Sequence, residues 1–205
     1  MILAVANQKG GVGKTALAVG MADVAARETG KPVLLVDADQ QGTAGSWAER
    51  CQDTEPLACT VVALPSAHLR RRLEGLDVGR YDLVVLDTPP GVPNVVESAL
   101  ELADVALLPA RPTTTDLDRL WPTWDLAGAA GTPALVVLTM ARAGTRSLDA
   151  ARVALDKEGA TVAETVVPMR EAIAQAFGRP PAGPLADASR SLLLELFNVA
   201  GRKQP

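Results

Sequence analysis

The chain has 205 residues, 48% of them hydrophobic, and a formal net charge of −4 from 20 basic and 24 acidic side chains. This length and apolar content suit one α/β domain, and no run of about 18 apolar residues is present that would predict a transmembrane helix. The acidic balance argues against a nucleic-acid module that is basic over its whole surface, and the N-terminus does not read as a signal peptide. We therefore expect a single cytoplasmic domain over residues 1–205.

Apolar strand patterns alternate with helical patterns along the chain, as a parallel sheet requires. Strands are expected at residues 2–6, 33–36, 60–63, 83–86, 105–109, 134–138 and 161–167. Helices are expected at residues 14–29, 43–50, 68–75, 95–103, 117–130, 147–158 and 186–200. Pro122 makes the helix over 117–130 questionable, because a proline inside a helix kinks it. The alternation predicts an α/β fold in which helices flank a doubly wound, mostly parallel sheet.

The segment between the first strand and the first helix reads Lys-Gly-Gly-Val-Gly-Lys-Thr over residues 9–15. Glycines let the backbone bend sharply and bring its N–H groups against phosphate oxygens. Lys14 would reach the β- and γ-phosphates, and Thr15 would offer its hydroxyl to Mg²⁺. Gln8 stands where the ordinary phosphate loop has its first glycine, and Lys9 is an additional lysine. The position of Lys9 suggests that it turns away from its own site and reaches a partner subunit.

Two further apolar strands end in carboxylates. Asp37 and Asp39 follow the second strand, and Asp87 ends the strand that leads into Thr-Pro-Pro-Gly. One such acid alone would be read as a turn or a helix cap, but three of them after a phosphate loop favour a nucleotide site. We expect Asp39 to orient the attacking water, and Asp37 and Asp87 to support the Mg²⁺ shell.

With residues 9–15, 36–42 and 86–91, the chain resembles the ParA/MinD family of ATPases that carry a deviant Walker A motif. It is most similar to the small plasmid-type partition ATPases of that family. Gln40 departs from the family pattern, which has a proline there, and residues 169–172 depart from the Arg-Asn-Val-Arg-like text of larger relatives.

The resemblance implies an enzyme that hydrolyses ATP to ADP and phosphate, with ATP and Mg²⁺ as its cofactors. The catalytic residues that it implies are Lys9, Lys14 and Asp39, and the metal-site residues are Thr15, Asp37, Asp39 and Asp87. The nucleotide-binding residues that it implies are Lys9, Gly10, Gly11, Val12, Gly13, Lys14, Thr15, Ala16, Met140, Pro168 and Met169.

The resemblance also implies an ATP-dependent homodimer that binds non-specific DNA, associates with the nucleoid when loaded, and positions a plasmid, a chromosome region or another cargo. A ParB-like or cargo-bound adaptor would stimulate hydrolysis. Residues 141–205 hold 9 basic and 7 acidic side chains, so the last third of the chain is slightly basic. A solvated face of mixed charge is the other interpretation of this segment. The candidate DNA contacts are Arg142, Arg146, Arg152, Arg170 and Arg179.

Two other functions stay open. The apolar segment 191–199 could lie on a membrane, as in a MinD-like ATPase for division-site placement, although its apolar residues on most sides favour packing on the sheet. A metabolic ligase or a metal carrier could use the same scaffold. The carrier is disfavoured because no cysteine follows Asp87, and the ligase because no substrate domain is evident.

Overall fold

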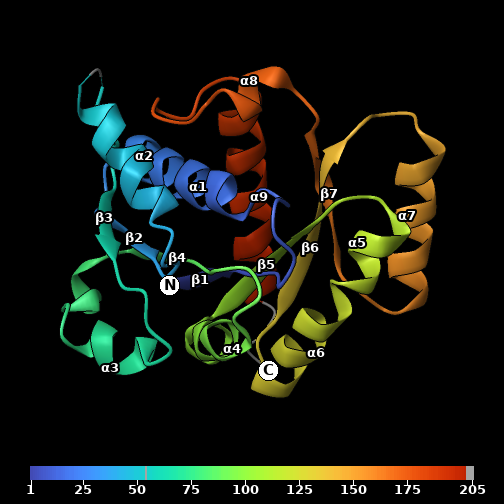
Figure 1. Cartoon of the computed structure of the whole chain (residues 1–205), viewed down its shortest axis with the longest axis horizontal. Helices are drawn as coiled ribbons and strands as arrows, with labels where there is room; N and C mark the ends of the chain where they lie inside the picture. The colour runs from blue at the N-terminus through green and yellow to red at the C-terminus, as the bar shows by residue number, and fades with distance from the viewer. Residues whose placement is uncertain (54, 202–205) are drawn as a thin grey trace.

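A computed structural model describes residues 1–53 and 55–201. Their strands form one seven-stranded sheet in the order β3-β2-β4-β1-β5-β6-β7, and all neighbouring strands are parallel (Figure 1). The strands are β1 (Ile2–Val5), β2 (Val33–Asp37), β3 (Thr60–Ala63), β4 (Leu83–Asp87), β5 (Val105–Ala110), β6 (Ala134–Ala141) and β7 (Val162–Pro168). The prediction of a doubly wound α/β fold is confirmed.

Helices cover both faces of the sheet, as Figure 1 shows. One layer contains α1 (Lys14–Thr29), α2 (Thr43–Gln52) and α9 (Pro184–Gly201), with the short α8 (Glu171–Ala174) at its edge. The other contains α3 (Leu69–Glu74), the 3-10 turn η1 (Val78–Arg80), α4 (Pro93–Leu102), α5 (Thr114–Asp118), α6 (Trp121–Ala130) and α7 (Arg146–Lys157).

Alternation along the strands divides the apolar residues between two cores. In β1, Leu3 and Val5 belong to the core under α1 and α9, whereas Ala4, and Ala6 directly after the strand, belong to the core under α4 and α6. All residues of β2, β4 and β5 are buried, which explains why these strands read as continuous apolar runs in the sequence. The carboxyl ends of the strands lie at one edge, where open α/β sheets bind ligands.

The helix expected over residues 117–130 is wrong in one respect, because two helices stand there. α5 ends at Asp118, and α6 begins at Trp121 with Pro122 in its first turn. A proline in the first turn replaces an N–H that has no helical acceptor in any case, so the break relieves the conflict that an interior proline would create. The turn η1 and the helix α8 were not predicted.

The C-terminal helix packs on the sheet, as the sequence favoured. α9 lies along α1 and contacts β7, and it buries Leu192 and Leu196 completely. Leu194 and Phe197 remain exposed on its outer side. Among the described helices, none has both the length and the apolar character needed to cross a membrane.

Candidate functional site

Strand register brings the ends of three strands together. Asp87 at the end of β4 lies beside Val5 of β1 on one side and beside Asp37 of β2 on the other. Neighbours in register on parallel strands point to the same face of the sheet. That face is covered by α1, so both carboxylates lie under the loop that begins this helix.

The loop between β1 and α1 is held from inside and from behind. Gly11 and Gly13 have positive φ values of 70° and 91°, a conformation that L side chains rarely adopt. The Lys14 ammonium donates to the Lys9 carbonyl oxygen at 2.9 Å. From the strands behind, the Thr139 hydroxyl donates to the Val12 carbonyl at 2.9 Å. These contacts fix a bent backbone whose N–H groups stand at the N-terminus of α1, the arrangement that binds phosphate.

Lys14 is the cation inside the loop. Its residue is 6% exposed, and burial lowers the pKa of its ammonium, an effect opposed by the nearby carboxylates of Asp87 and Asp39. Lys14 therefore lies in the field of the two acids that the sequence predicted to act with it. The structure brings these three residues into one site.

Asp87 is the buried acid at the centre of this site. Burial raises its pKa to about 7, and the Thr15 hydroxyl opposes that rise. Neither of its carboxylate oxygens has a hydrogen-bond partner of normal geometry among the described residues. A buried carboxylate beside a threonine hydroxyl is a suitable donor set for a divalent cation, so Asp87 and Thr15 fit Mg²⁺.

Asp37 and Asp39 shape the loop after β2. Asp37 is fully buried, and its two oxygens accept the backbone N–H groups of Asp39 at 3.1 Å and of Gly45 at 3.0 Å. Asp39 accepts the N–H of Gln41 at 2.9 Å. Within the described residues, no group of three acidic, histidine or cysteine side chains forms a metal cage. Mg²⁺ commonly takes one or two carboxylates plus water and phosphate oxygens, so such a cage is not required.

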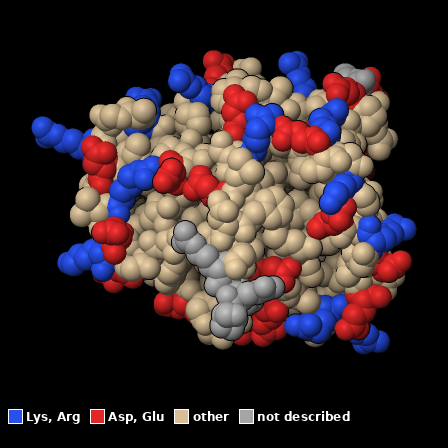
Figure 2. All heavy atoms as spheres, turned by 180° about the vertical axis from the view of Figure 1, so that it is seen from behind, with Lys and Arg blue, Asp and Glu red and all other residues tan. Residues whose placement is uncertain are grey.

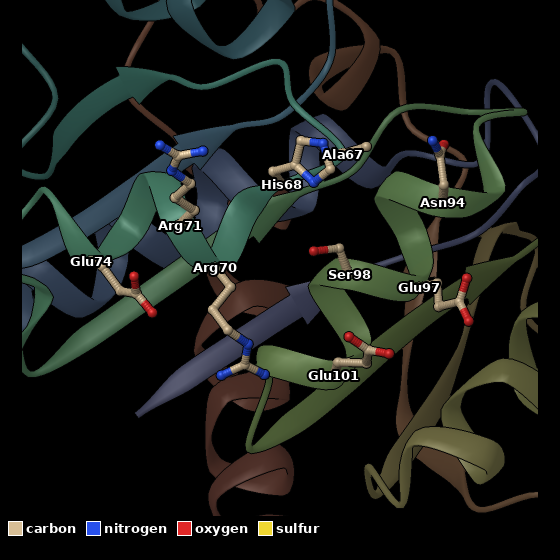
Figure 3. A pocket seen from close by; sticks show the side chains of 9 residues that line it. All are labelled: Ala67, His68, Arg70, Arg71, Glu74, Asn94, Glu97, Ser98 and Glu101. Atoms are coloured by element: carbon tan, nitrogen blue, oxygen red, sulfur yellow. The ribbon is translucent and has the colours of Figure 1, made fainter.

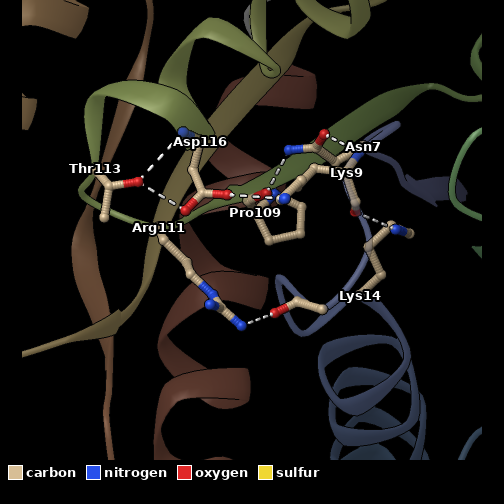
Figure 4. Close-up of polar contacts among 8 residues, drawn as sticks. Asn7, Lys9, Lys14, Pro109, Arg111, Thr113 and Asp116 are labelled. Atoms are coloured by element: carbon tan, nitrogen blue, oxygen red, sulfur yellow. Dashed lines mark hydrogen bonds and ion pairs between the residues drawn. The ribbon is translucent and has the colours of Figure 1, made fainter.

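Lys9 points elsewhere than Lys14. Its ammonium lies 4.0 Å from an Asp116 carboxylate oxygen on α5, and its side chain is 42% exposed (Figure 4). Its backbone N–H donates to the Asn7 side-chain oxygen at 2.8 Å. The Lys9 ammonium therefore lies beside α5, and its reach to a partner subunit stays a prediction.

A pocket of about 440 Å³ adjoins the start of α1. It is lined by Met140, Pro168 and Met169, for which nucleotide contact stays a prediction, and by Val12, Gly13, Thr15 and Ala16 from the loop and α1. Met140 has a positive φ of 50°, which is unusual for a residue other than glycine, and β6 and β7 shift register at this point. Strain at a pocket wall is a frequent feature of binding sites.

Sequence reasoning missed two aromatic residues of this pocket. Trp47 on α2 and Phe177 after α8 both line it, and their rings meet edge to face with centroids 5.6 Å apart. The Trp47 indole N–H donates to the Arg179 carbonyl at 2.8 Å, and the Arg50 guanidinium stacks on Phe177. Because 132 residues separate Trp47 from Arg179, no local pattern connected them.

The candidate DNA-binding arginines differ in their surroundings. Arg142, Arg146, Arg170 and Arg179 are exposed, whereas Arg152 is half-buried and donates to the Glu164 carbonyl. On the face shown in Figure 2, acidic and basic side chains lie close to one another around the rim, and outside the grey atoms no broad area carries one sign of charge. DNA contact therefore stays a prediction for this set of arginines.

A separate pocket of about 480 Å³ lies between α3 and α4 (Figure 3). Arg70 and Arg71 line it from α3, and Glu97 and Glu101 line it from α4. His68, the one histidine of the sequence, is exposed at the start of α3. Acids face the arginines across this pocket, so it is a poor site for phosphate and does not compete with the loop before α1.

Comparison with known proteins identifies the family. Residues 3–180 match the family described as CobQ/CobB/MinD/ParA nucleotide binding domain. The chain is 40% identical over 178 residues to Maintenance of carboxysome distribution protein A from Gloeobacter kilaueensis. This match covers 86% of this chain and 77% of that protein. It is 28% identical over 228 residues to Chromosome partitioning protein ParA from Caulobacter vibrioides, covering 87% and 85% of the two chains.

A solved structure shares the fold at lower identity. The septum site-determining protein MinD from Pyrococcus horikoshii, solved in complex with Mg-ADP, superposes with a TM-score of 0.77 and 21% identity over 98% of each chain. The cofactors expected from the sequence agree with that complex, and the predicted ATPase class is confirmed. The chain belongs to the CobQ/CobB/MinD/ParA nucleotide-binding family, as an ATPase of the ParA/MinD type.

Proposed function

We propose that this protein is a Mg²⁺-ATP-driven dimerisation switch that binds DNA without sequence preference and positions a cargo. The observation that carries the proposal is the division of labour between the two lysines of the loop. Lys14 fills its own phosphate loop, while the exposed side chain of Lys9 is directed away from it. A lysine that the resident site does not use is available to a second subunit.

In this proposal each residue of the site has a defined task. Lys14 and the loop N–H groups bind the phosphates, and Thr15 and Asp87 hold Mg²⁺, which neutralises phosphate charge. Asp39 orients the attacking water, and Asp37 keeps the loop around Asp39 in shape through its two backbone hydrogen bonds.

Lys9 acts in the partner's site. A cation supplied in trans raises phosphoryl-transfer rates by ~10³–10⁵ in related systems, so a single subunit would hydrolyse ATP slowly. Hydrolysis then removes the phosphate that holds the two subunits together. The dimer separates, and its hold on DNA weakens, because two copies of a few phosphate contacts are reduced to one.

The named relatives support a positioning role. One of them is a carboxysome distribution protein and another is a chromosome partitioning protein, so both act on the location of a cargo. The proposal covers a plasmid, a chromosome region or a protein assembly as cargo, with an adaptor on the cargo that stimulates hydrolysis. Association with the nucleoid in the ATP state belongs to the same proposal.

The experiment that tests this function is retention on a non-specific DNA duplex with ATP, with ADP and without nucleotide, over a salt series. We expect retention with Mg²⁺-ATP only, with an affinity that falls steeply as salt rises. Arg146→Ala and Arg179→Ala, at two exposed positions, should each weaken retention while leaving nucleotide binding unchanged. Absence of retention in every nucleotide state would contradict the DNA-binding part of the proposal.

A further inference from the structure

The segment from the end of β5 to α5 forms a support behind the phosphate loop. The Asn7 amide donates to the Pro109 carbonyl at 2.8 Å, and the Arg111 guanidinium donates to the Gly11 carbonyl at 2.6 Å. Asp116 lies at the far end of the same segment, 4.0 Å from the Lys9 ammonium (Figure 4). This segment therefore holds both the loop backbone and its additional lysine.

The Asp116 carboxylate is fixed in place. Its side chain is 10% exposed, and one of its oxygens accepts the Thr113 hydroxyl at 2.7 Å. Thr113 also caps α5, since its hydroxyl oxygen accepts the backbone N–H of Asp116. One carboxylate oxygen is held by the turn, and the other faces Lys9.

Lys9, by contrast, is free to move at its tip. Its backbone is fixed by the N–H contact to Asn7 and by the Lys14 ammonium on its carbonyl oxygen. Its side chain is four times as exposed as that of Asp116, at 42% against 10%. The ammonium can thus leave Asp116 by rotation of the side chain, without a change in the loop.

We propose that Asp116 is a positioning residue that holds Lys9 within the single subunit and competes for it with the nucleotide phosphates of a partner subunit. This inference rests on the proposed function, in which Lys9 acts in trans. Phosphates draw Lys9 away only when two loaded subunits meet, so Asp116 sets the protein concentration at which the loaded protein dimerises. A half-exposed ion pair is weak, and the shift that it causes is therefore modest.

The first test measures the dimer dissociation constant by sedimentation velocity with Mg²⁺ and a non-hydrolysable ATP analogue. Asp116→Asn should dimerise at a concentration about two- to fivefold lower than the wild type, the range that a half-exposed ion pair supplies. Asp118→Asn is the matched control, because it removes the same charge from an exposed position on α5. It should dimerise like the wild type.

A background of Lys9→Ala separates this effect from a change in folding. In that background Asp116→Asn should not lower the concentration at which dimers form, because the competition needs the lysine. A double variant that dimerised at the concentration where Asp116→Asn alone does would overturn the inference. With Lys9 present, Asp116→Glu should dimerise at a protein concentration close to that of the wild type. If Asp116→Asn dimerised at the same protein concentration as the wild type or at a higher one, the inference would be overturned. Damage to α5 is not an alternative explanation of the expected result, because such damage can weaken dimerisation but cannot strengthen it through Lys9.

A second test reads the contact in the nucleotide-free single subunit and does not depend on dimerisation. Acylation of Lys9 by an amine-reactive ester, followed by peptide mass spectrometry and normalised to Lys157 on α7, should be faster in Asp116→Asn than in the wild type. Equal Lys9 rates in the two proteins would overturn the inference. Failure of the wild type to dimerise with the analogue would instead overturn the proposed function, and the acylation rates would still decide whether Asp116 holds Lys9.

Discussion

At the scale of single residues, Asp87 is a carboxylate whose ionised form the folded protein disfavours. It is 1% exposed, and its pKa of about 7 lies well above the ordinary value of 3.8 because burial removes water from it. A group of this kind binds its proton more tightly in the folded state than in the unfolded state. The contribution of Asp87 to the free energy of unfolding is therefore highest below pH 4, and it falls as the pH rises toward 7.

Replacing Asp87 by Asn should therefore stabilise the protein in a pH-dependent way. Without nucleotide and Mg²⁺, we expect Asp87→Asn to raise the free energy of unfolding at pH 8, by at most about 4 kcal/mol, and by much less at pH 5. Urea unfolding at the two pH values measures the difference, with the exposed Asp125→Asn as a control. An equal gain at both pH values would show that the raised pKa is not its cause.

At the scale of elements, the packing of α1 against α9 depends on a glycine. A Cβ added at Gly20 would stand 2.3 Å from the Ser189 hydroxyl oxygen, which is buried between the two helices. Such a contact cannot be accommodated without moving Ser189 or the helix. Gly128 on α6 is also helical, but no atom outside its own helix lies within 4 Å of its added Cβ.

Replacement by alanine should change the free energy of unfolding in opposite directions at these two glycines. Gly20→Ala should destabilise the protein by about 1–3 kcal/mol through overpacking. Gly128→Ala should stabilise it by about 0.5–1 kcal/mol, because alanine is the better helix former and the site is open. Thermal and urea unfolding measure both variants, and Gly20→Ala combined with Ser189→Ala, which removes the clashing hydroxyl, should recover most of the loss. A neutral Gly20→Ala would refute this account of the α1 and α9 contact.

The sequence could predict the local elements of the site, but not the contacts between distant elements. The phosphate loop and the acids after β2 and β4 are local patterns, and parallel pairing then places all strand ends at one edge, so the core of the site followed from the sequence. Asp116 and Trp47 were not assigned their contacts, because these join segments more than 100 residues apart and depend on the order of the strands. A further long-range contact of this kind is the hydrogen bond from the Gln8 N–H to the Thr123 hydroxyl oxygen on α6, at 3.3 Å.

At the scale of the whole molecule, one subunit is an incomplete ATPase under the proposed function. The chain carries a net charge of −4, so the proposed DNA binding would depend on local arginines and on the pairing of two subunits rather than on overall charge. Lys14, Thr15 and Asp87 lie together in one subunit, whereas Lys9 leaves that site for Asp116. In the proposed function, dimerisation is the step that completes the site and couples ATP binding to DNA binding.

Sedimentation velocity of the wild type and of Lys9→Ala, each with Mg²⁺ and a non-hydrolysable ATP analogue, tests this claim most directly. Titration calorimetry in parallel should show that Lys9→Ala still binds the nucleotide, whereas Lys14→Ala loses that binding. We expect the wild type to sediment as a dimer and Lys9→Ala to remain a single subunit at concentrations at least about tenfold higher, corresponding to about 1.4 kcal/mol or more of lost association energy. A Lys9→Ala protein that dimerised at the same concentration as the wild type would contradict the account.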